Sequence, residues 1–144
     1  MKPIERRRLN QGALPALLGY RLRLAQQAVF RDFAASVQGL SPGRVGLLIT
    51  IDANPGITQS RLAEAAERDR STMVGVLDQL ETRGLIERRR GEDRRTNGLW
   101  LTRAGRSLLA RALRAIDRHE RRIAARLSAA QRRQLLALLD RIGR

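Results

Sequence analysis

The stretch Ile57–Leu101, ITQSRLAEAAERDRSTMVGVLDQLETRGLIERRRGEDRRTNGLWL, decides the fold of this 144-residue chain. Two segments with helical spacing of apolar residues precede an arginine-rich segment with hairpin turn signals. We place the hairpin tip at Gly91-Glu92-Asp93 and its strands near residues 86–90 and 97–101, because a turn at Asn97-Gly98 leaves too short a second strand. Two short helices followed by a basic β-hairpin predict a winged helix-turn-helix.

Each of the two helices has its own start or stop signal. Thr58 is placed to cap the first helix, with Ile57 and Leu62 spaced as a hydrophobic staple. The second helix opens near Asp69 and ends before Gly84, a preferred helix C-cap residue. Its predicted buried face consists of Met73, Leu77 and Leu80. Its opposite face has side chains able to bind a base edge or a phosphate, namely Arg70, Ser71, Thr72, Asp78 and Gln79.

These residues resemble the MarR family of dimeric winged-helix regulators, which control genes in response to small molecules. The most specific match is Asp93-x-Arg95, followed after five residues by Leu101-Thr102-x-x-Gly105. The segment Asp69-Arg70-Ser71-Thr72 resembles the start of the family's recognition helix. The resemblance implies a mainly α fold with one β-hairpin wing and a single domain over residues 1–144. Residues 1–38 and 103–144 would form dimerisation helices around a winged helix-turn-helix at 41–101.

Two positions depart from the family pattern. The turn between the two short helices, Ala65-Ala66-Glu67-Arg68, lacks the usual glycine. Gly75 lies inside the recognition helix, where it costs about 1 kcal/mol relative to alanine. Either a close approach of DNA to the backbone or simple sequence drift would explain this glycine.

Helical periodicity also marks the segments outside the winged helix. The stripe from Leu14 to Val37 predicts one long helix. Ser41 and Pro42 are an N-cap and first-turn pair, and the apolar helix after them is expected to be buried. Thr102 is placed to cap a long helix over residues 103–126. The segment Ser128-Ala129-Ala130-Gln131 is a capping box that opens a last helix.

Strand alternation predicts which residues of the wing face the core. In the second strand, Leu99 and Leu101 are expected to point inward and Trp100 outward. Because an exposed tryptophan is unusual, we expect Trp100 to pack against a neighbouring element.

Composition narrows the function classes. The net charge of +15 favours polyanionic partners, meaning nucleic acid or an anionic membrane surface. The chain has no cysteine and one histidine, His119, which excludes thiol redox chemistry, cysteine-ligated metals and histidine-based catalytic sites. We therefore expect no enzyme, cofactor or metal, and a structural or interface role for His119. Without a membrane span or signal peptide, the expected location is cytoplasmic.

The candidate DNA contacts fall into three groups, with double-stranded DNA bound by a homodimer on a pseudo-palindromic site. Helix-borne polar residues would face the major groove or a phosphate: Thr58, Gln59, Ser60, Arg70, Ser71, Thr72 and Gln79. On the first wing strand, Arg88, Arg89 and Arg90 would contact phosphate, with alternate side chains pointing away. Arg94 and Arg95 would reach the minor groove, and Asp93 matches the family residue that positions the wing arginine.

Ligand sensing follows from the resemblance. Family members often bind aromatic acids or related anions between the dimerisation helices and the winged-helix lobe. Residues able to stack on a ring or pair with an anion are Tyr20, Arg21, Arg23, Phe30 and Arg44. The simpler interpretation is that the aromatic residues pack and the arginines are surface charges.

Two classes of function fit the sequence. The first is a transcriptional regulator, expected to be a repressor released by a small-molecule effector. The second is a sequence-tolerant DNA-architectural or RNA-binding protein, which the charge alone supports equally well. The two long apolar helices beside the winged helix favour the regulator. No pair of residues has a recognisable catalytic arrangement, which disfavours an enzyme.

Overall fold

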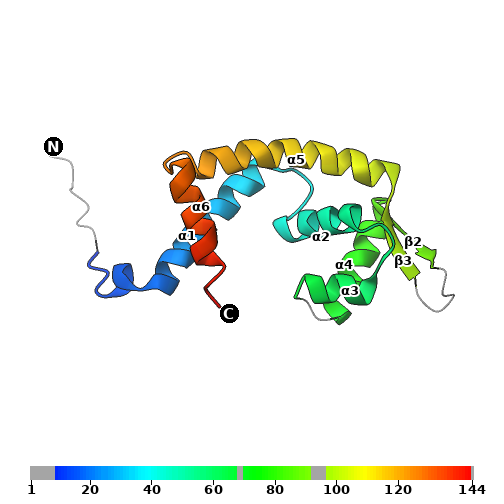
Figure 1. Cartoon of the computed structure of the whole chain (residues 1–144), viewed down its shortest axis with the longest axis horizontal. Coiled ribbons are helices and arrows are strands. Elements are labelled where there is room, and N and C mark those ends of the chain that lie inside the picture. The colour runs from blue at the N-terminus through cyan, green and yellow to red at the C-terminus, as the bar shows by residue number, and fades with distance from the viewer. Residues whose placement is uncertain (1–8, 68–69, 92–96, 144) are drawn as a thin grey trace, which may run out of the picture.

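The computed structural model describes residues 9–67, 70–91 and 97–143 (Figure 1). This part of the chain is mainly helical, as predicted, with a small three-stranded sheet. The helices are α1 (Leu18–Ser36), α2 (Pro42–Ala53), α3 (Gln59–Ala65), α4 (Arg70–Thr82), α5 (Arg103–Ile123) and α6 (Ala129–Leu139). The strands are β1 (Ile57–Thr58), β2 (Ile86–Arg90) and β3 (Asn97–Leu101).

The winged helix consists of α2, α3, α4 and the antiparallel sheet, whose strand order is β1-β3-β2. Strands β2 and β3 have the predicted bounds, and Arg90 pairs with Asn97 at the end of the hairpin where the connecting turn begins. The sequence predicted a two-stranded hairpin only. Strand β1, in which Ile57 pairs with Leu99, was not predicted. Because β1 has only two residues, it has no periodicity for a sequence pattern to show.

The core lies where α2, α3 and α4 meet the sheet. Its fully buried large side chains are Leu48, Ile51, Leu62, Met73, Leu77, Leu80, Ile86 and Leu99. The predicted stripe of α4 is therefore confirmed, and so is the inward direction of Leu99 and Leu101. The expected burial of α2 is wrong at Ile49, which is 42% exposed because α5, α3 and the sheet cover the other sides of this helix.

Side-chain caps start the helices at the positions that the sequence indicates. Ser41 Oγ accepts the backbone N–H of Arg44 at 3.3 Å, and Thr58 Oγ1 accepts that of Arg61 at 3.3 Å. The capping box at Ser128 is complete, with Gln131 bonding back to the backbone N–H of Ser128. Each cap satisfies backbone donors that have no partner inside their helix.

The long N-terminal helix begins later than predicted. Residues Leu14–Ala16 form a 3-10 turn, and Leu17 has an extended backbone with ψ of 123° before α1 starts at Leu18. The apolar spacing continues across this break, so periodicity alone could not show it. The helix predicted to reach Arg126 also ends earlier, because the backbone leaves helical geometry at Ala124.

The turn between α3 and α4 places its strain on a non-glycine residue. Glu67 has a φ of 51°, in the left-handed region that a glycine would occupy without a Cβ penalty. Gly84 after α4 has a φ of 70°, which confirms its predicted role as a helix C-cap.

The start of α5 is attached to the end of α4 by residues of the Leu101-Thr102-x-x-Gly105 motif. Thr102 Oγ1 donates to the carbonyl of Gly84 at 2.6 Å and accepts the N–H of Gly105 at 2.9 Å. The N–H of Thr102 donates to the carbonyl of Leu85 at 3.1 Å. A Cβ on Gly105 would lie 1.9 Å from that same carbonyl oxygen, so only glycine allows this approach.

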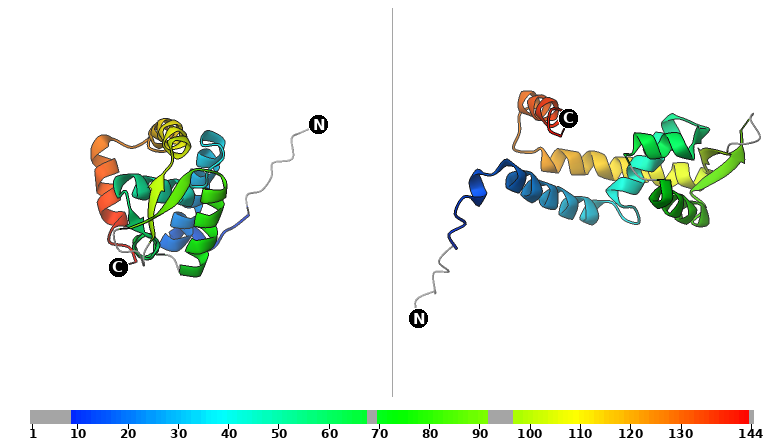
Figure 2. Two further views of the ribbon diagram at one scale, coloured as in Figure 1. Left: turned by 90° about the vertical axis from the view of Figure 1, so that its right-hand side faces the viewer. Right: turned by 90° about the horizontal axis from the view of Figure 1, so that it is seen from below.

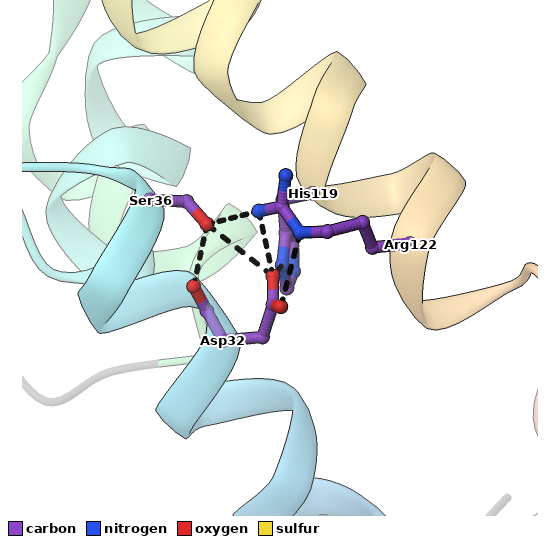
Figure 3. A network of polar contacts seen from close by, with 4 residues as sticks. All are labelled: Asp32, Ser36, His119 and Arg122. Atoms are coloured by element: carbon purple, nitrogen blue, oxygen red, sulfur yellow. Dashed lines mark hydrogen bonds and ion pairs between the residues drawn. The ribbon is translucent and has the colours of Figure 1, made fainter.

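A polar network joins α1 to α5 (Figure 3). Asp32 Oδ1 lies 2.6 Å from His119 Nδ1, and the Arg122 guanidinium donates to both Asp32 oxygens at 2.9 and 3.1 Å. Ser36 Oγ donates to the Asp32 carbonyl at 2.6 Å. His119 is 2% exposed and packs edge-on against Phe33, which confirms its structural role. Among the described residues, no helix is long and apolar enough to span a membrane.

The approach of Gly105 to Leu85 predicts the effect of adding one methyl group. Gly105→Ala should lower the free energy of unfolding by about 1–3 kcal/mol or more, because the backbones must separate. Gly46→Ala is the control, since its Cβ would meet nothing within 4 Å and alanine favours the helix by about 1 kcal/mol. Thermal denaturation measures both, and equal stability of the two variants would contradict the packing.

The network around Asp32 predicts a pH-dependent contribution to stability. Hydrogen bonds from Arg122 and His119 hold the pKa of the Asp32 carboxyl well below its usual range. Its stabilisation is therefore complete above the unfolded pKa, about 3.9, and is lost as pH falls toward the lower folded pKa. Asp32→Asn should lower the melting temperature at pH 7, and its difference from the wild type should shrink below about pH 4.

Asp117→Asn is the matched control, because Asp117 pairs with Arg121 on the exposed face of α5. This variant should melt close to the wild type at every pH, since exposed ion pairs contribute little. A constant difference for Asp32→Asn across the pH range would show that the carboxylate charge is not what stabilises the contact.

Candidate nucleic-acid interface

The first turn of α3 and the wing form one polar surface. Thr58, Gln59 and Ser60 border an open depression of about 240 Å³ together with Arg88, Asn97 and Leu99. Strand β1 produces this arrangement, because its pairing with β3 holds the start of α3 against the wing. Thr58 Oγ1 accepts the N–H of Arg61 as a helix cap, and its own O–H is still a donor, as are groups of Gln59 and Ser60, so all three stay candidates for a phosphate.

Helix α4 presents its polar residues away from the core. Met73, Leu77 and Leu80 face inward, so Ser71, Thr72, Asp78 and Gln79 are exposed on the other side. Gly75 lies on this outer face, and a Cβ there would meet no atom within 4 Å. The chain's own packing therefore does not require this glycine. Arg70 is the first residue of the helix.

Arg88 joins the wing to α4. Its guanidinium donates to Asp78 Oδ1 at 2.7 Å and to Glu81. Burial lowers the pKa of Arg88, but its hydrogen bonds to the two carboxylates outweigh this and raise the pKa above its usual value. The side chain is only 23% exposed, so Arg88 fixes β2 against α4. The contact of Arg88 with a phosphate stays a prediction. Its pairing with α4 was not predicted, although two carboxylates three residues apart on a helix were a usable signal.

The neighbouring arginines of β2 differ in their surroundings. Arg89 lies on the opposite face of the strand, with its guanidinium carbon 5.2 Å from the centre of the Trp100 ring, and it pairs with Glu87. Trp100 also covers Gly56 and Gly98, where a Cβ would lie 3.0 and 2.6 Å from the ring. The expectation that Trp100 packs against a neighbouring element is thus confirmed.

Arg90 is exposed at the end of β2, next to the wing tip. The other predicted wing contacts, Asp93, Arg94 and Arg95, lie outside the described residues. The structure therefore describes the base of the wing, and the roles of these three residues stay predictions.

The five candidate ligand residues are not all brought together. The Arg44 guanidinium donates to the Gln79 side chain, which places Arg44 beside the recognition helix. On α1, Arg23 lies over the Tyr20 ring at 5.2 Å and Arg21 donates to the carbonyl of Pro15 at 2.8 Å. Phe30 is 50% exposed. Four of the five candidates therefore lie on α1, whereas Arg44 lies on α2 and contacts α4.

Sequence analysis missed a second contact of the recognition helix. Arg83, just after α4, donates to the carbonyl of Gly39 at 2.9 Å, in the connection between α1 and α2. Together with the contact of Arg44 to Gln79, it attaches the C-terminal half of α4 to the start of α2. Neither arginine has a local sequence signal, because each partner is more than 30 residues away.

Comparison with known proteins places this geometry in a family. Residues 40–96 match the model of the MarR family. The chain is 43% identical over 140 residues to a putative transcriptional regulatory protein for the hcr operon of Thauera aromatica, covering 94% of this chain and 84% of that protein. The chain belongs to the MarR family. Its predicted class, a winged-helix regulator flanked by long helices, is confirmed.

Solved structures of MarR-family proteins share the whole architecture. The transcriptional repressor CouR bound to a 23-mer DNA duplex superposes with a TM-score of 0.89 and 42% identity, over 94% of this chain and 99% of that one. CouR bound to p-coumaroyl-CoA gives a TM-score of 0.86 and 40% identity, over 94% and 98%. The likeness covers α1, α5 and α6 as well as the winged helix.

Proposed function

We propose that this protein is a dimeric transcriptional repressor that binds a pseudo-palindromic DNA site and is released by the coenzyme A thioester of an aromatic acid. The observation that carries the proposal is the match over nearly the whole chain to a repressor bound to DNA, at 42% identity. The polar surface of α3, α4 and the wing supplies the groups that such binding needs. Gln79, Ser71 and Thr72 would face the major groove, and Gln59, Ser60 and Arg90 would bind phosphates.

The dimer is supported by an unpaired apolar surface. Helix α6 has 11 residues and none of its side chains is buried. Four of the exposed residues are leucines, each more than 40% exposed: Leu135, Leu136, Leu138 and Leu139. A helix this short is marginal in water by itself, so another surface must cover its apolar side. The view from below in Figure 2 shows α6 standing apart from α1.

A groove of about 460 Å³ lies between α1, α5 and α6 and is lined mostly by apolar side chains, including Leu22, Val29, Ile123 and Leu127. A second copy would fill it with its own terminal helices and bury both apolar faces. The two recognition helices would then reach major grooves roughly 34 Å apart on one face of the duplex.

The effector class comes from the same relative. CouR is a repressor that binds p-coumaroyl-CoA, and this chain is 40% identical to it over 94% of its length. A thioester of this kind combines an aromatic ring with a highly charged nucleotide. Tyr20, Arg21, Arg23 and Phe30 on α1 are our candidates to contact it, because they supply ring surface and positive charge.

DNA reading and phosphate attraction are separable by mutation. The wild type should bind DNA from upstream of its own gene at least roughly a thousandfold more tightly than a scrambled duplex at physiological salt. Arg95→Ala should cost about 1–3 kcal/mol on that DNA and less on the scrambled duplex, because we place it in the minor groove. Arg90→Ala should weaken both equally and reduce the slope of log affinity against log salt by about 1.

These affinities are measured by fluorescence anisotropy across a salt series. If the two variants weaken both duplexes to the same extent, the assignment of Arg95 to base or groove reading is wrong. Equal wild-type affinity for both duplexes would favour a sequence-tolerant DNA-binding protein over a repressor.

Release by the effector is tested on the preformed complex. p-Coumaroyl-CoA should weaken operator binding by roughly 5- to 150-fold, the range of a typical coupling free energy. Coenzyme A and p-coumaric acid, each alone, are the controls and should have a small effect, because each supplies only part of the contact. If p-coumaric acid alone released the protein from the DNA completely, the thioester would not be required. The effector would then be a simple aromatic acid.

A further inference from the structure

The net positive charge of this protein lies mainly outside the winged helix, the part that we propose reads DNA. Residues 41–101, the winged helix, contain ten arginines and nine carboxylates, for a net charge of +1. Residues 102–144 alone contain 12 arginines and three carboxylates, for a net charge of +9. Most of the net charge of +15 therefore lies in the segments on either side of the winged helix.

Helix α5 arranges part of this excess on one face. Successive positions on an α-helix are 100° apart, so residues separated by three, four or seven positions share a side. Four exposed arginines follow this spacing, Arg111, Arg114, Arg118 and Arg121. Arg103 is five full turns before Arg121 and so lies on the same side. We call these five residues the arginine face of α5. The buried side of the same helix consists of Gly105, Leu109, Ala112, Ala115 and His119. The arginine face is thus opposite the side that packs on α1, α2 and β3.

Few intramolecular contacts neutralise the arginine face. Arg121 pairs with Asp117, and Arg111 donates to Ser107 Oγ at 3.0 Å. Arg103, Arg114 and Arg118 have no carboxylate partner among the described residues. Like charges held side by side repel one another, so binding of an anionic partner would relieve this repulsion.

We propose that the arginine face of α5 is a second, sequence-independent binding surface for double-stranded DNA, so that the protein holds two DNA segments at once. From Arg103 to Arg121 the face extends roughly 27 Å, which corresponds to about eight base pairs. Arginine suits phosphate because its planar guanidinium donates two parallel hydrogen bonds.

The position of α5 makes the second segment distinct from the first. Figure 1 shows α5 along one edge of the molecule and α3 near the opposite edge, with α2 between them. A duplex on α3, α4 and the wing does not lie against the arginine face. An anionic membrane is a poorer partner, because a membrane-bound helix inserts its apolar side and that of α5 is buried in the protein.

A two-duplex capture experiment tests the proposal. Beads bearing the upstream DNA are saturated with protein, and capture of a labelled 20-base-pair duplex of unrelated sequence is measured across salt. The wild type should capture the second duplex, and the triple variant Arg111→Gln, Arg114→Gln, Arg118→Gln should capture at least tenfold less. Its binding to the bead DNA, measured separately, should stay within twofold of the wild type.

Two matched variants complete the design. The triple Arg→Lys variant at positions 111, 114 and 118 keeps the charge and should retain capture. Arg31→Gln, Arg126→Gln and Arg133→Gln together remove the same charge at exposed positions off this face and should also retain it. The proposal would be overturned if the wild type captured no second duplex, or if both glutamine variants lost capture equally. A tenfold preference of the wild type for single-stranded RNA of equal length would also overturn it. A failure of sequence-specific binding shows in the bead-DNA measurement alone, so it is distinguishable from failure of the second surface.

Discussion

The contact between the start of α5 and the end of α4 is the constraint on which the other elements depend. Thr102 and Gly105 bring the first turn of α5 against the backbone of Gly84 and Leu85, at the point where α4 ends and β2 begins. The recognition helix, the wing and the long helix of the flanking region therefore meet within a few residues. A rotation of α5 must displace α4 or the wing, because the backbone of Gly105 is already in close contact with the carbonyl of Leu85.

Most of the local structure could be predicted from the sequence because its causes are local. The caps at Ser41, Thr58 and Ser128 need only a side-chain oxygen and a backbone N–H three residues later. The stripe of α4 and the strands of the wing have periods that a short window of sequence shows. The MarR family assignment rests on such local motifs, and the comparisons confirm it.

The features that could not be predicted depend on residues distant in the sequence or on very short segments. Arg44 finds Gln79 across 35 positions and Arg83 finds Gly39 across 44, so no spacing rule indicates them. Arg88 is a different case, because Asp78 and Glu81 lie three positions apart on α4 and were a usable signal for its pairing. The assignment of the wing arginines to phosphate left this signal out. The break at Leu17 leaves the apolar pattern of α1 unchanged, so the pattern alone could not show it.

Net charge failed to separate the two function classes because it is a sum over parts with different roles. Because the winged helix is close to neutral, the selective DNA binding that we propose for it would depend on hydrogen bonds and groove shape more than on attraction to phosphate. The flanking segments supply the long-range field, which raises the rate of encounter with any DNA and weakens with salt. A regulator and a sequence-tolerant DNA-binding protein are therefore not exclusive readings of this chain. On the two proposals above, the winged helix would select the site, and the arginine face of α5 would add affinity that does not depend on sequence.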